Sequence, residues 1–278
     1  AIVDFIENRI ALTTYFAEDD FIDDANMKTA NEIAGLTFNE IKNLNSDFPD
    51  YIKQFWTYSL NVEYLYEQNE ELVATVFDRL NRNGEPLTYQ ELRNAKYNDS
   101  ILLKTIKALV KDDFWNDKLA RLKSVRMEDV EFISELFFII LEDKVLDSSQ
   151  KVLDELYNKY QDDEQNIKRG EEEFRNVIKV LSGLKLDFNS NKRLCWTTHL
   201  YTMFSFAWTL MKKNIKPETA ERAVKKFYEE YFSKKTSYEG YLKDYKDASS
   251  SRTRSETQRK KRLSALLLYC GINMDSSK

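Results

Sequence analysis

The hydrophobic residues of this chain recur mostly three and four positions apart, the spacing that places them on one face of an α-helix. Beyond residue 98 this spacing covers nearly the whole chain. The expected helices span residues 101–111, 127–144, 149–160, 171–184, 192–213, 217–232 and 256–269. Residues 60–66 depart from the pattern, because apolar side chains there alternate with a period of two, which predicts a β-strand.

Local signals mark where two shorter helices begin. Thr37 precedes Glu40 by three positions, and Thr88 precedes Glu91 in the same way. In such a capping box the Thr hydroxyl and the Glu carboxylate each bind a backbone N–H group that the helix leaves unpaired. The helix expected before the second box ends at Gly84, so this part of the chain is predicted to run strand, helix, tight turn and helix.

The composition also favours helices. The chain has 278 residues, of which 42% are hydrophobic, enough for a sizeable core in one large domain or two small ones. This excludes disorder as the general state of the chain. The 6 Gly and 3 Pro are too few for the tight turns of a sandwich or barrel, or for a glycine-rich loop that holds phosphate. We therefore expect a mainly α protein.

Charge is unevenly distributed along the chain, whose net charge is −5. The first fifty residues hold 11 acidic side chains against 3 basic ones, and the acidic run within residues 18–24 lacks the glycine of a calcium-binding loop. Residues 249–263 instead hold six basic side chains against one acidic one. We expect these six to contact nucleic-acid phosphates, or else to form a solvated helix face or to pair with the acidic N-terminal region. They are Arg252, Arg254, Arg259, Lys260, Lys261 and Arg262.

Cysteine and histidine are too scarce for several kinds of site. Two cysteines and one histidine cannot assemble a zinc cluster, a disulfide framework or a histidine-rich metal site. We therefore expect no metal site and a reducing, cytoplasmic location. Cys195 and His199 would share one helix face, which is conceivable as a nucleophilic pair. We favour a buried thiol and a hydrogen-bonded buried imidazole, because both residues lie in an apolar segment.

Residues 194–211 form an uncharged stretch whose length only just reaches that of a membrane span. Threonine, serine and histidine dilute it, and the mean hydropathy of the chain is −0.60. We expect a buried core helix here and no membrane partner. The first residues lack the basic region and the cleavage site of a signal peptide, so none is expected.

The segment 77–95 is the most specific string in the chain, and it resembles the signature of the GmrSD-type restriction family. This large bacterial family has an N-terminal domain of ParB-like or sulfiredoxin-like fold with nuclease and NTPase activity. Residues 1–12 look like the helix that follows the Asp-Gly-Gln-Gln-Arg motif of the family, and residues 60–66 look like a core strand. The positions that carry the clearest resemblance are Phe77, Asn81, Gly84, Leu87, Glu91, Leu92, Arg93, Asn94 and Ala95.

The resemblance implies how the chain is divided. The Asp-Gly-Gln-Gln-Arg and Gln-Arg motifs, which the family uses for phosphate chemistry, do not occur in these 278 residues. We therefore expect residues 1–97 to be the C-terminal remnant of a truncated α/β ParB-like domain, and residues 98–278 to form a multi-helix domain. The missing motifs would be supplied by a missing N-terminal domain or by another chain.

The resemblance also implies roles for five motif residues near the missing active site. Phe77 is expected in the core and Gly84 at the turn. Asn81 and Arg93 are expected to face the missing active site, and Glu91 to cap a helix or orient a neighbour. A purely structural corner accounts for the same residues, because turn formation and capping alone explain Gly84 and Glu91.

The sequence leaves two alternative functions for this chain. By resemblance, the intact protein is a DNA-defence nuclease that cleaves foreign DNA in a nucleotide-dependent, modification-sensitive way, with NTP and Mg²⁺ as implied cofactors. This chain would be its largely helical part, with no catalytic residues and no cofactor of its own. The alternative is a helical module that binds DNA or protein without catalysis.

Overall fold

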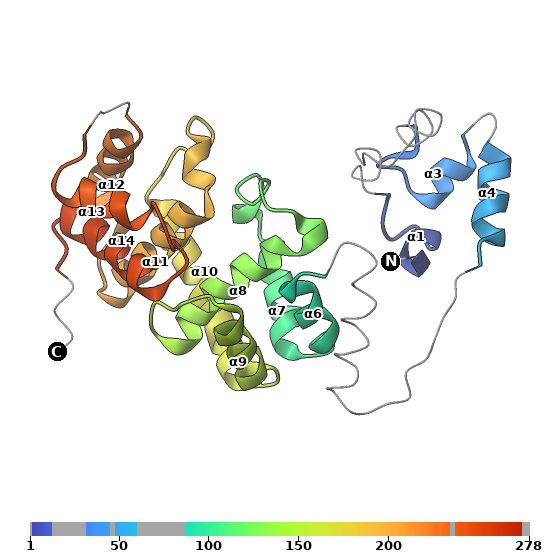
Figure 1. The fold of residues 1–278 in the computed structure, drawn as a ribbon, viewed down its shortest axis with the longest axis horizontal. Coiled ribbons are helices and arrows are strands. Elements are labelled where there is room, and N and C mark those ends of the chain that lie inside the picture. Colours follow the sequence, from blue (N-terminus) through green and yellow to red (C-terminus); the bar gives the residue numbers. More distant parts are fainter. Residues whose placement is uncertain (1, 13–31, 45–47, 60–86, 234–236, 274–278) are drawn as a thin grey trace. The chain divides into compact units, whose positions relative to one another are not determined.

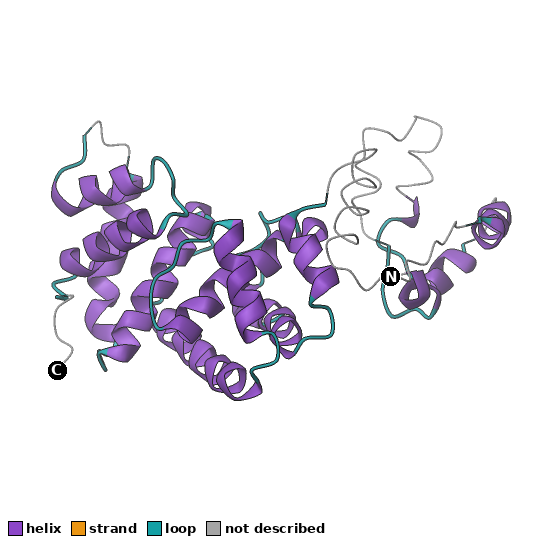
Figure 2. Ribbon diagram, turned by 60° about the horizontal axis from the view of Figure 1, so that its bottom comes forward, coloured by secondary structure: helices purple, strands orange, loops and turns teal. Residues whose placement is uncertain are grey.

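The computed structural model describes residues 2–12, 32–44, 48–59, 87–233 and 237–273. Within these ranges every regular element is a helix and no strand occurs (Figure 1 and Figure 2). This confirms the prediction of a mainly α protein. The predicted strand at 60–66 and the residues Phe77, Asn81 and Gly84 lie outside the described residues, so their expected roles stay predictions.

The chain divides into two compact units, Ala1–Thr75 and Val76–Lys278. The resemblance places the expected domain boundary between residues 97 and 98, and that division into domains stays a prediction. Helix α6 (Tyr89–Lys96) precedes that boundary, yet it packs on α8 and α9 of the second unit. The motif helix is therefore part of the helical body.

The described helices of the first unit are α1 (Ile2–Ile6), α3 (Phe38–Lys42) and α4 (Phe48–Thr57). The predicted start of α3 is confirmed, because the Glu40 carboxylate accepts hydrogen bonds from the Thr37 backbone N–H and hydroxyl, both at 2.7 Å. The ring of Phe38 packs at 5.5 Å from those of Phe5 and Phe55. Aromatic contacts thus join three helices that are too short to be stable alone.

The second unit consists of nine described α-helices: α6, α7 (Ile101–Val110), α8 (Glu128–Glu142), α9 (Gln150–Tyr160), α10 (Glu164–Gly183), α11 (Thr197–Lys212), α12 (Pro217–Phe232), α13 (Gly240–Ala248) and α14 (Glu256–Tyr269). Most of their bounds agree with the predicted ranges. Helix α11 starts later than predicted, because residues 192–195 form a short 3₁₀ helix first. Helix α13 was not predicted.

Helix α10 begins seven residues before its predicted start. Asp163 caps it by accepting a hydrogen bond from the Asn166 backbone N–H. Gly170 has a low helix propensity, so the sequence pattern predicted the helix to start only after it and missed residues 164–170. A Cβ at Gly170 would lie 2.8 Å from Leu141 Cδ2 and 3.2 Å from Phe137 Cζ, so glycine permits close packing on α8.

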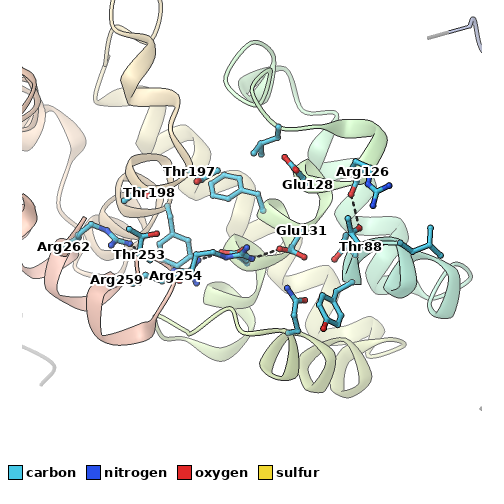
Figure 3. Close-up of a pocket in the computed structure, with 18 residues that line it drawn as sticks. Thr88, Arg126, Glu128, Glu131, Thr197, Thr198, Thr253, Arg254, Arg259 and Arg262 are labelled. Atoms are coloured by element: carbon cyan, nitrogen blue, oxygen red, sulfur yellow. Dashed lines mark hydrogen bonds and ion pairs between the residues drawn. The ribbon is translucent and has the colours of Figure 1, made fainter. Parts of the chain in front are cut away.

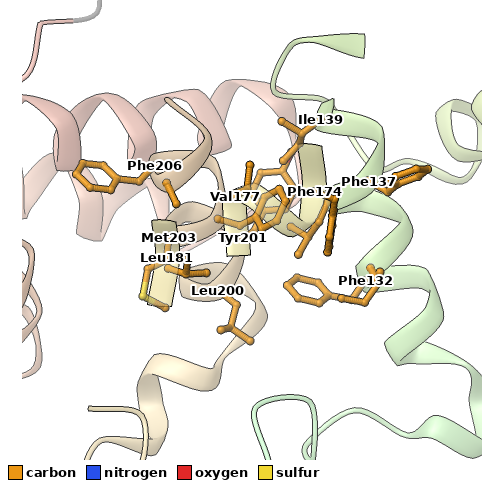
Figure 4. Packing of buried hydrophobic residues seen from close by; sticks show 14 of the residues in the cluster. Phe132, Phe137, Ile139, Phe174, Val177, Leu181, Leu200, Tyr201, Met203 and Phe206 are labelled. Atoms are coloured by element: carbon orange, nitrogen blue, oxygen red, sulfur yellow. The ribbon is translucent and has the colours of Figure 1, made fainter. Parts of the chain in front are cut away.

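Helices α8, α10 and α11 form the centre of the second unit (Figure 4). The ring of Phe174 on α10 lies 6.1 Å from that of Phe137 on α8 and 4.9 Å from that of Phe204 on α11. All three side chains are fully buried, and burial of each contributes about 1.5–3 kcal/mol. Helix α11 is buried on nearly every side, which confirms the prediction of a buried helix at 194–211.

Among the helices of the described residues, none combines the length and the apolar character needed to cross a bilayer.

Candidate functional site

A cavity of about 440 Å³ lies within the second unit, against helices α6, α8, α11 and α14 (Figure 3). Most of the residues that line it carry charged or hydrogen-bonding groups, although apolar atoms form the larger part of its exposed surface. Four of its residues are arginines and three are glutamates. The residues that line it are Leu87, Thr88, Tyr89, Gln90, Leu122, Arg126, Glu128, Glu131, Phe132, Glu135, Gln150, Thr197, Thr198, Tyr201, Thr253, Arg254, Arg259 and Arg262.

Glu131 of α8 lies at the centre of the charged groups. Its Oε2 pairs with Arg93 Nη2 at 2.8 Å, and its Oε1 pairs with Arg254 Nη2 at 2.5 Å. Figure 3 shows Arg254 reaching toward Glu131 from the segment before α14. Two segments that the sequence marked separately, the family-like motif and the basic segment, therefore meet on one carboxylate.

Arg93 is an internal residue of the second unit, with 3% of its surface exposed. Its Nε donates to Gln90, its Nη1 to Asp154 and Gln150, and its Nη2 to Glu131 and again Gln150. All five N–H groups of the guanidinium are therefore used within this unit. The guanidinium therefore lies against α8 and α9, and its expected place beside a missing active site stays a prediction.

Glu91 caps helix α6, as one of its two expected roles requires. Its Oε2 accepts the Thr88 backbone N–H at 2.6 Å, and its own N–H donates to the Thr88 hydroxyl at 3.1 Å. The carboxylate also pairs with Arg126 at 3.3 Å. The capping box thus fixes the start of the motif helix at the cavity wall.

Two arginines of the basic segment point into the protein. Arg259 is 4% exposed, pairs with Glu135, donates to the Leu146 carbonyl at 2.8 Å and lies 3.7 Å above the Tyr201 ring. Arg262 is 1% exposed, and its Nη groups donate to the carbonyls of Ala248 and Thr253, each at 2.6 Å. Their guanidinium groups are occupied inside the fold, which removes both from the expected nucleic-acid surface.

Burial and neighbouring charges act differently on two of these arginines. Burial lowers the pKa of Arg262, because neutral oxygens rather than a carboxylate surround its guanidinium. Burial acts in the same direction on Arg254, but the carboxylates of Glu135 and Glu131 outweigh it and raise the pKa of Arg254. Arg254 is half exposed, and its guanidinium bridges these two glutamates.

The remaining basic residues of the segment are on the surface. Arg252, Lys260 and Lys261 are exposed, and Lys260 pairs with Glu256 one turn earlier on α14. The six expected phosphate contacts therefore divide into three surface cations and three arginines that bind groups of the protein itself.

Cys195 and His199 lie in the interior, as the core interpretation predicted. His199 Nδ1 lies 2.8 Å from the Tyr245 hydroxyl, and burial lowers the pKa of His199 to about 3. Burial also raises the pKa of the Cys195 thiol. Both groups are neutral at pH 7, so they do not form the thiolate and imidazolium of a nucleophilic pair.

The cavity depends on residues that sequence reasoning did not select. Glu131 and Glu135 lie one turn apart on α8, in a helix that is otherwise largely apolar. A pair of acidic residues on the buried face of such a helix is a signal that could have indicated buried basic partners. Within the described part of the chain, no group of three His, Cys, Asp or Glu residues is arranged to hold a metal ion.

Comparisons with protein-family models, with curated proteins and with solved structures gave no match for this chain.

Proposed function

We propose that this chain is the largely helical part of a GmrSD-like bacterial DNA-defence protein, and that it positions and binds rather than cuts. The support from sequence is the resemblance of residues 77–95 to the family signature. In this proposal residues 1–97 derive from the end of a ParB-like domain, whose last helix, α6, packs on α8 and α9 of the helical unit. Nucleotide-dependent cleavage of modified DNA, with NTP and Mg²⁺, belongs to the intact protein.

The observation that carries the proposal is the bridge through Glu131. Arg93 of the motif and Arg254 of the basic segment bind its two carboxylate oxygens. Glu131 is only partly exposed and is shared by two cations, so displacing the buried Arg93 would leave charge uncompensated. The family-like motif is thereby linked mechanically to the helices at the other end of the chain.

A reconstitution experiment tests the proposal. The chain alone, and the same chain preceded by a ParB-like domain with the Asp-Gly-Gln-Gln-Arg motif, are assayed with Mg²⁺ for NTP hydrolysis and for cleavage of modified and unmodified DNA. We expect activity only when both parts are present. Activity of the chain alone contradicts the assignment of the chemistry, and an inactive combination contradicts the family assignment.

A second function, DNA binding without catalysis, is favoured by the exposed cations at the start of α14. Lys260 and Lys261 are adjacent and exposed, and Arg252 is exposed nearby. Each phosphate contact by such a residue makes the affinity for DNA more sensitive to salt.

Fluorescence anisotropy with labelled DNA tests this second function. The double variant Lys260→Ala/Lys261→Ala should bind more weakly, with a salt slope lower by about 2. Lys226→Ala is a matched control, because Lys226 is exposed and has its own pairing with Glu230 one turn away on α12. Unchanged affinity in the double variant would show that α14 is not the contact. Arg259→Ala and Arg262→Ala are unsuitable here, since both remove internal contacts.

A further inference from the structure

Trp196 is the most exposed tryptophan of the second unit. It is 44% exposed, whereas Trp115 is buried and Trp208 is partly buried. It lies between the 3₁₀ helix Lys192–Cys195 and the first residue of α11. The ring of His199 packs nearly parallel to its indole, with the ring centroids 6.1 Å apart. An indole that is held by the protein and is still exposed offers a flat surface on which another ring can stack.

Cations from two separate segments converge on this tryptophan. The guanidinium carbon of Arg121 lies 5.7 Å from the centre of the indole. Burial raises the pKa of the adjacent Cys195 thiol, and three positive charges oppose that rise. These charges belong to Lys192, Lys118 and Arg121. The two segments therefore form one surface, which we call the Trp196 surface and which consists of Lys118, Arg121, Lys192, Arg193 and Trp196.

Carboxylates do not neutralise the Trp196 surface. None of its four cations forms an ion pair within the described residues, and the acidic residues closest to them in the sequence are only Asp117 and Asp187. Burial lowers the pKa of Lys118, and the charge of Lys192 acts in the same direction, as is expected where like charges lie close together. Carboxylates of the same unit pair instead with Arg93, Arg126, Arg175, Arg254 and Arg259.

Aromatic rings hold two of these cations in place. Lys118 Nζ lies 4.3 Å from the centre of the Phe114 ring and donates to the Phe114 carbonyl at 2.7 Å. The guanidinium carbon of Arg193 lies 4.5 Å from the centre of the Phe232 ring, and its Nη2 donates to the Phe232 carbonyl at 3.0 Å. Because the rings and the carbonyls are neutral, these contacts position the cations without cancelling their charge. Aromatic and cationic groups thus alternate along this part of the protein.

We propose that the Trp196 surface binds single-stranded nucleic acid, with a base stacked on the indole and the backbone phosphates beside the four cations. Proteins that bind single strands combine a positively charged surface with aromatic side chains on which bases stack. The bases of a duplex are stacked on one another, so an unpaired strand suits an exposed indole better. An acidic peptide would satisfy the cations and leave the indole unused. Single-stranded DNA and RNA share the required chemistry.

This surface goes beyond the proposed function, because none of its residues belongs to the family-like motif at 77–95 or to α14. Binding here requires neither the family assignment nor catalysis.

Fluorescence anisotropy with the full chain tests the binding at constant ionic strength. The labelled probes are oligo(dT), oligo(rU), a duplex of the same length, and an abasic oligomer that carries the phosphates without the bases. Phosphatidylglycerol vesicles are a further probe, because tryptophan and cations also suit an anionic membrane surface. We expect both single strands to bind about fivefold or more tightly than the duplex and the abasic oligomer, since each stacked base strengthens binding.

Substitutions of Trp196 locate the stacked base. Trp196→Leu keeps an apolar side chain without a ring and should weaken the binding of oligo(dT) about fivefold or more. Trp196→Tyr keeps a ring and should retain the affinity, while the quenching of tryptophan fluorescence by the bound strand should disappear. Tyr241→Leu is the matched control and should bind normally, because Tyr241 is 42% exposed on α13 and is not part of the Trp196 surface. If Trp196→Leu unfolds the chain, the fluorescence of Trp196→Tyr decides the question.

Removal of two cations tests the phosphate contacts. Arg121 and Lys192 are exposed, and their side chains make no hydrogen bond or ion pair in the part of the chain that the structure describes. Arg121→Ala/Lys192→Ala should therefore keep the fold and bind oligo(dT) more weakly, with a salt slope lower by about 1.4. Lys151→Ala/Lys226→Ala is the control, because it changes the net charge equally at two exposed lysines that each pair with a glutamate one turn away.

Several results would overturn the inference. They are single strands that bind no more tightly than the duplex or the abasic oligomer, unchanged affinity in folded Trp196→Leu, quenching that persists in Trp196→Tyr, and binding of vesicles but not of single strands. An equal loss of affinity in Lys151→Ala/Lys226→Ala would also overturn it, because the effect would then be one of net charge. Nuclease reconstitution involves none of these variants, and Lys260→Ala/Lys261→Ala tests α14 alone, so this inference and the proposed function can fail separately.

Discussion

Removal of the Glu135 carboxylate is the sharpest test of the ion pairs that link Glu131 and Glu135 to their arginine partners. Glu135 is 5% exposed and pairs with Arg259, which is 4% exposed. In Glu135→Leu the guanidinium of Arg259 stays buried without a carboxylate. Loss of one partner of such a pair costs about 3–5 kcal/mol of the free energy of unfolding.

Some contacts of Arg259 remain in Glu135→Leu, so we expect the loss of unfolding free energy to lie at the lower end of this range. Arg259 keeps its hydrogen bond to the Leu146 carbonyl and its position above the Tyr201 ring. A desolvated cation–π contact stabilises the cation by about 2 kcal/mol, which offsets part of the lost pairing. Arg254 also keeps Glu131 as a partner. We therefore expect a loss of about 3 kcal/mol.

The measurement is urea unfolding of the second unit, followed by circular dichroism. Lys260→Ala is the control on α14, because its exposed pair with Glu256 should contribute only about 0.3–0.5 kcal/mol. The double variant Glu135→Leu/Arg259→Met removes both charges and should be more stable than Glu135→Leu alone. A loss below about 1 kcal/mol in Glu135→Leu, or a double variant that shows the full sum of the single losses, would refute the reasoning.

Three further predictions concern packing, pH and thiol reactivity. Gly170→Ala should lower the free energy of unfolding by about 1 kcal/mol in urea titrations, because crowding against α8 exceeds the gain in helix propensity; a stabilised variant would contradict this. Burial lowers the pKa of His199 to about 3, so between pH 6.5 and pH 3 the unfolded chain binds a proton that the folded chain does not. The free energy of unfolding therefore decreases as the pH is lowered, by about 2 kcal/mol between neutral pH and pH 5. The free energy of unfolding of His199→Gln, measured in unfolding titrations at pH 7.5 and pH 5, should decrease less than that of the unmodified chain. An identical decrease in both chains would contradict the assignment to His199. Burial raises the pKa of Cys195, and raises that of Cys270 to about 12, so both thiols should react slowly with iodoacetamide at pH 8 in the folded chain and quickly in urea; fast labelling of the native chain would disprove their inertness.

Much of the secondary structure could be predicted because its signals are local. The apolar spacing indicated most of the second unit's helices, and the Thr88 and Glu91 side chains form the expected capping box. Local signals failed where tertiary packing overrides propensity. Gly170 lies inside α10 because the close approach of α8 requires a residue without a side chain.

The site was much less predictable than the helices. Arg93 and Glu131 are 38 residues apart, and Arg254 and Glu131 are 123 residues apart, so no spacing rule joins them. The basic segment reads as one patch in the sequence. In the structure, Arg259 and Arg262 share an inward face of α14, while Lys260 and Lys261 are exposed.

The sequence by itself determined the helical class, the capping box of the motif helix and the buried nature of residues 194–211, because these depend on the order of residues within a few turns. Only the tertiary structure decided which cations are internal and which carboxylate joins the motif to the basic segment. A helical period fixes which residues share a face, but the packing of distant helices fixes what that face meets.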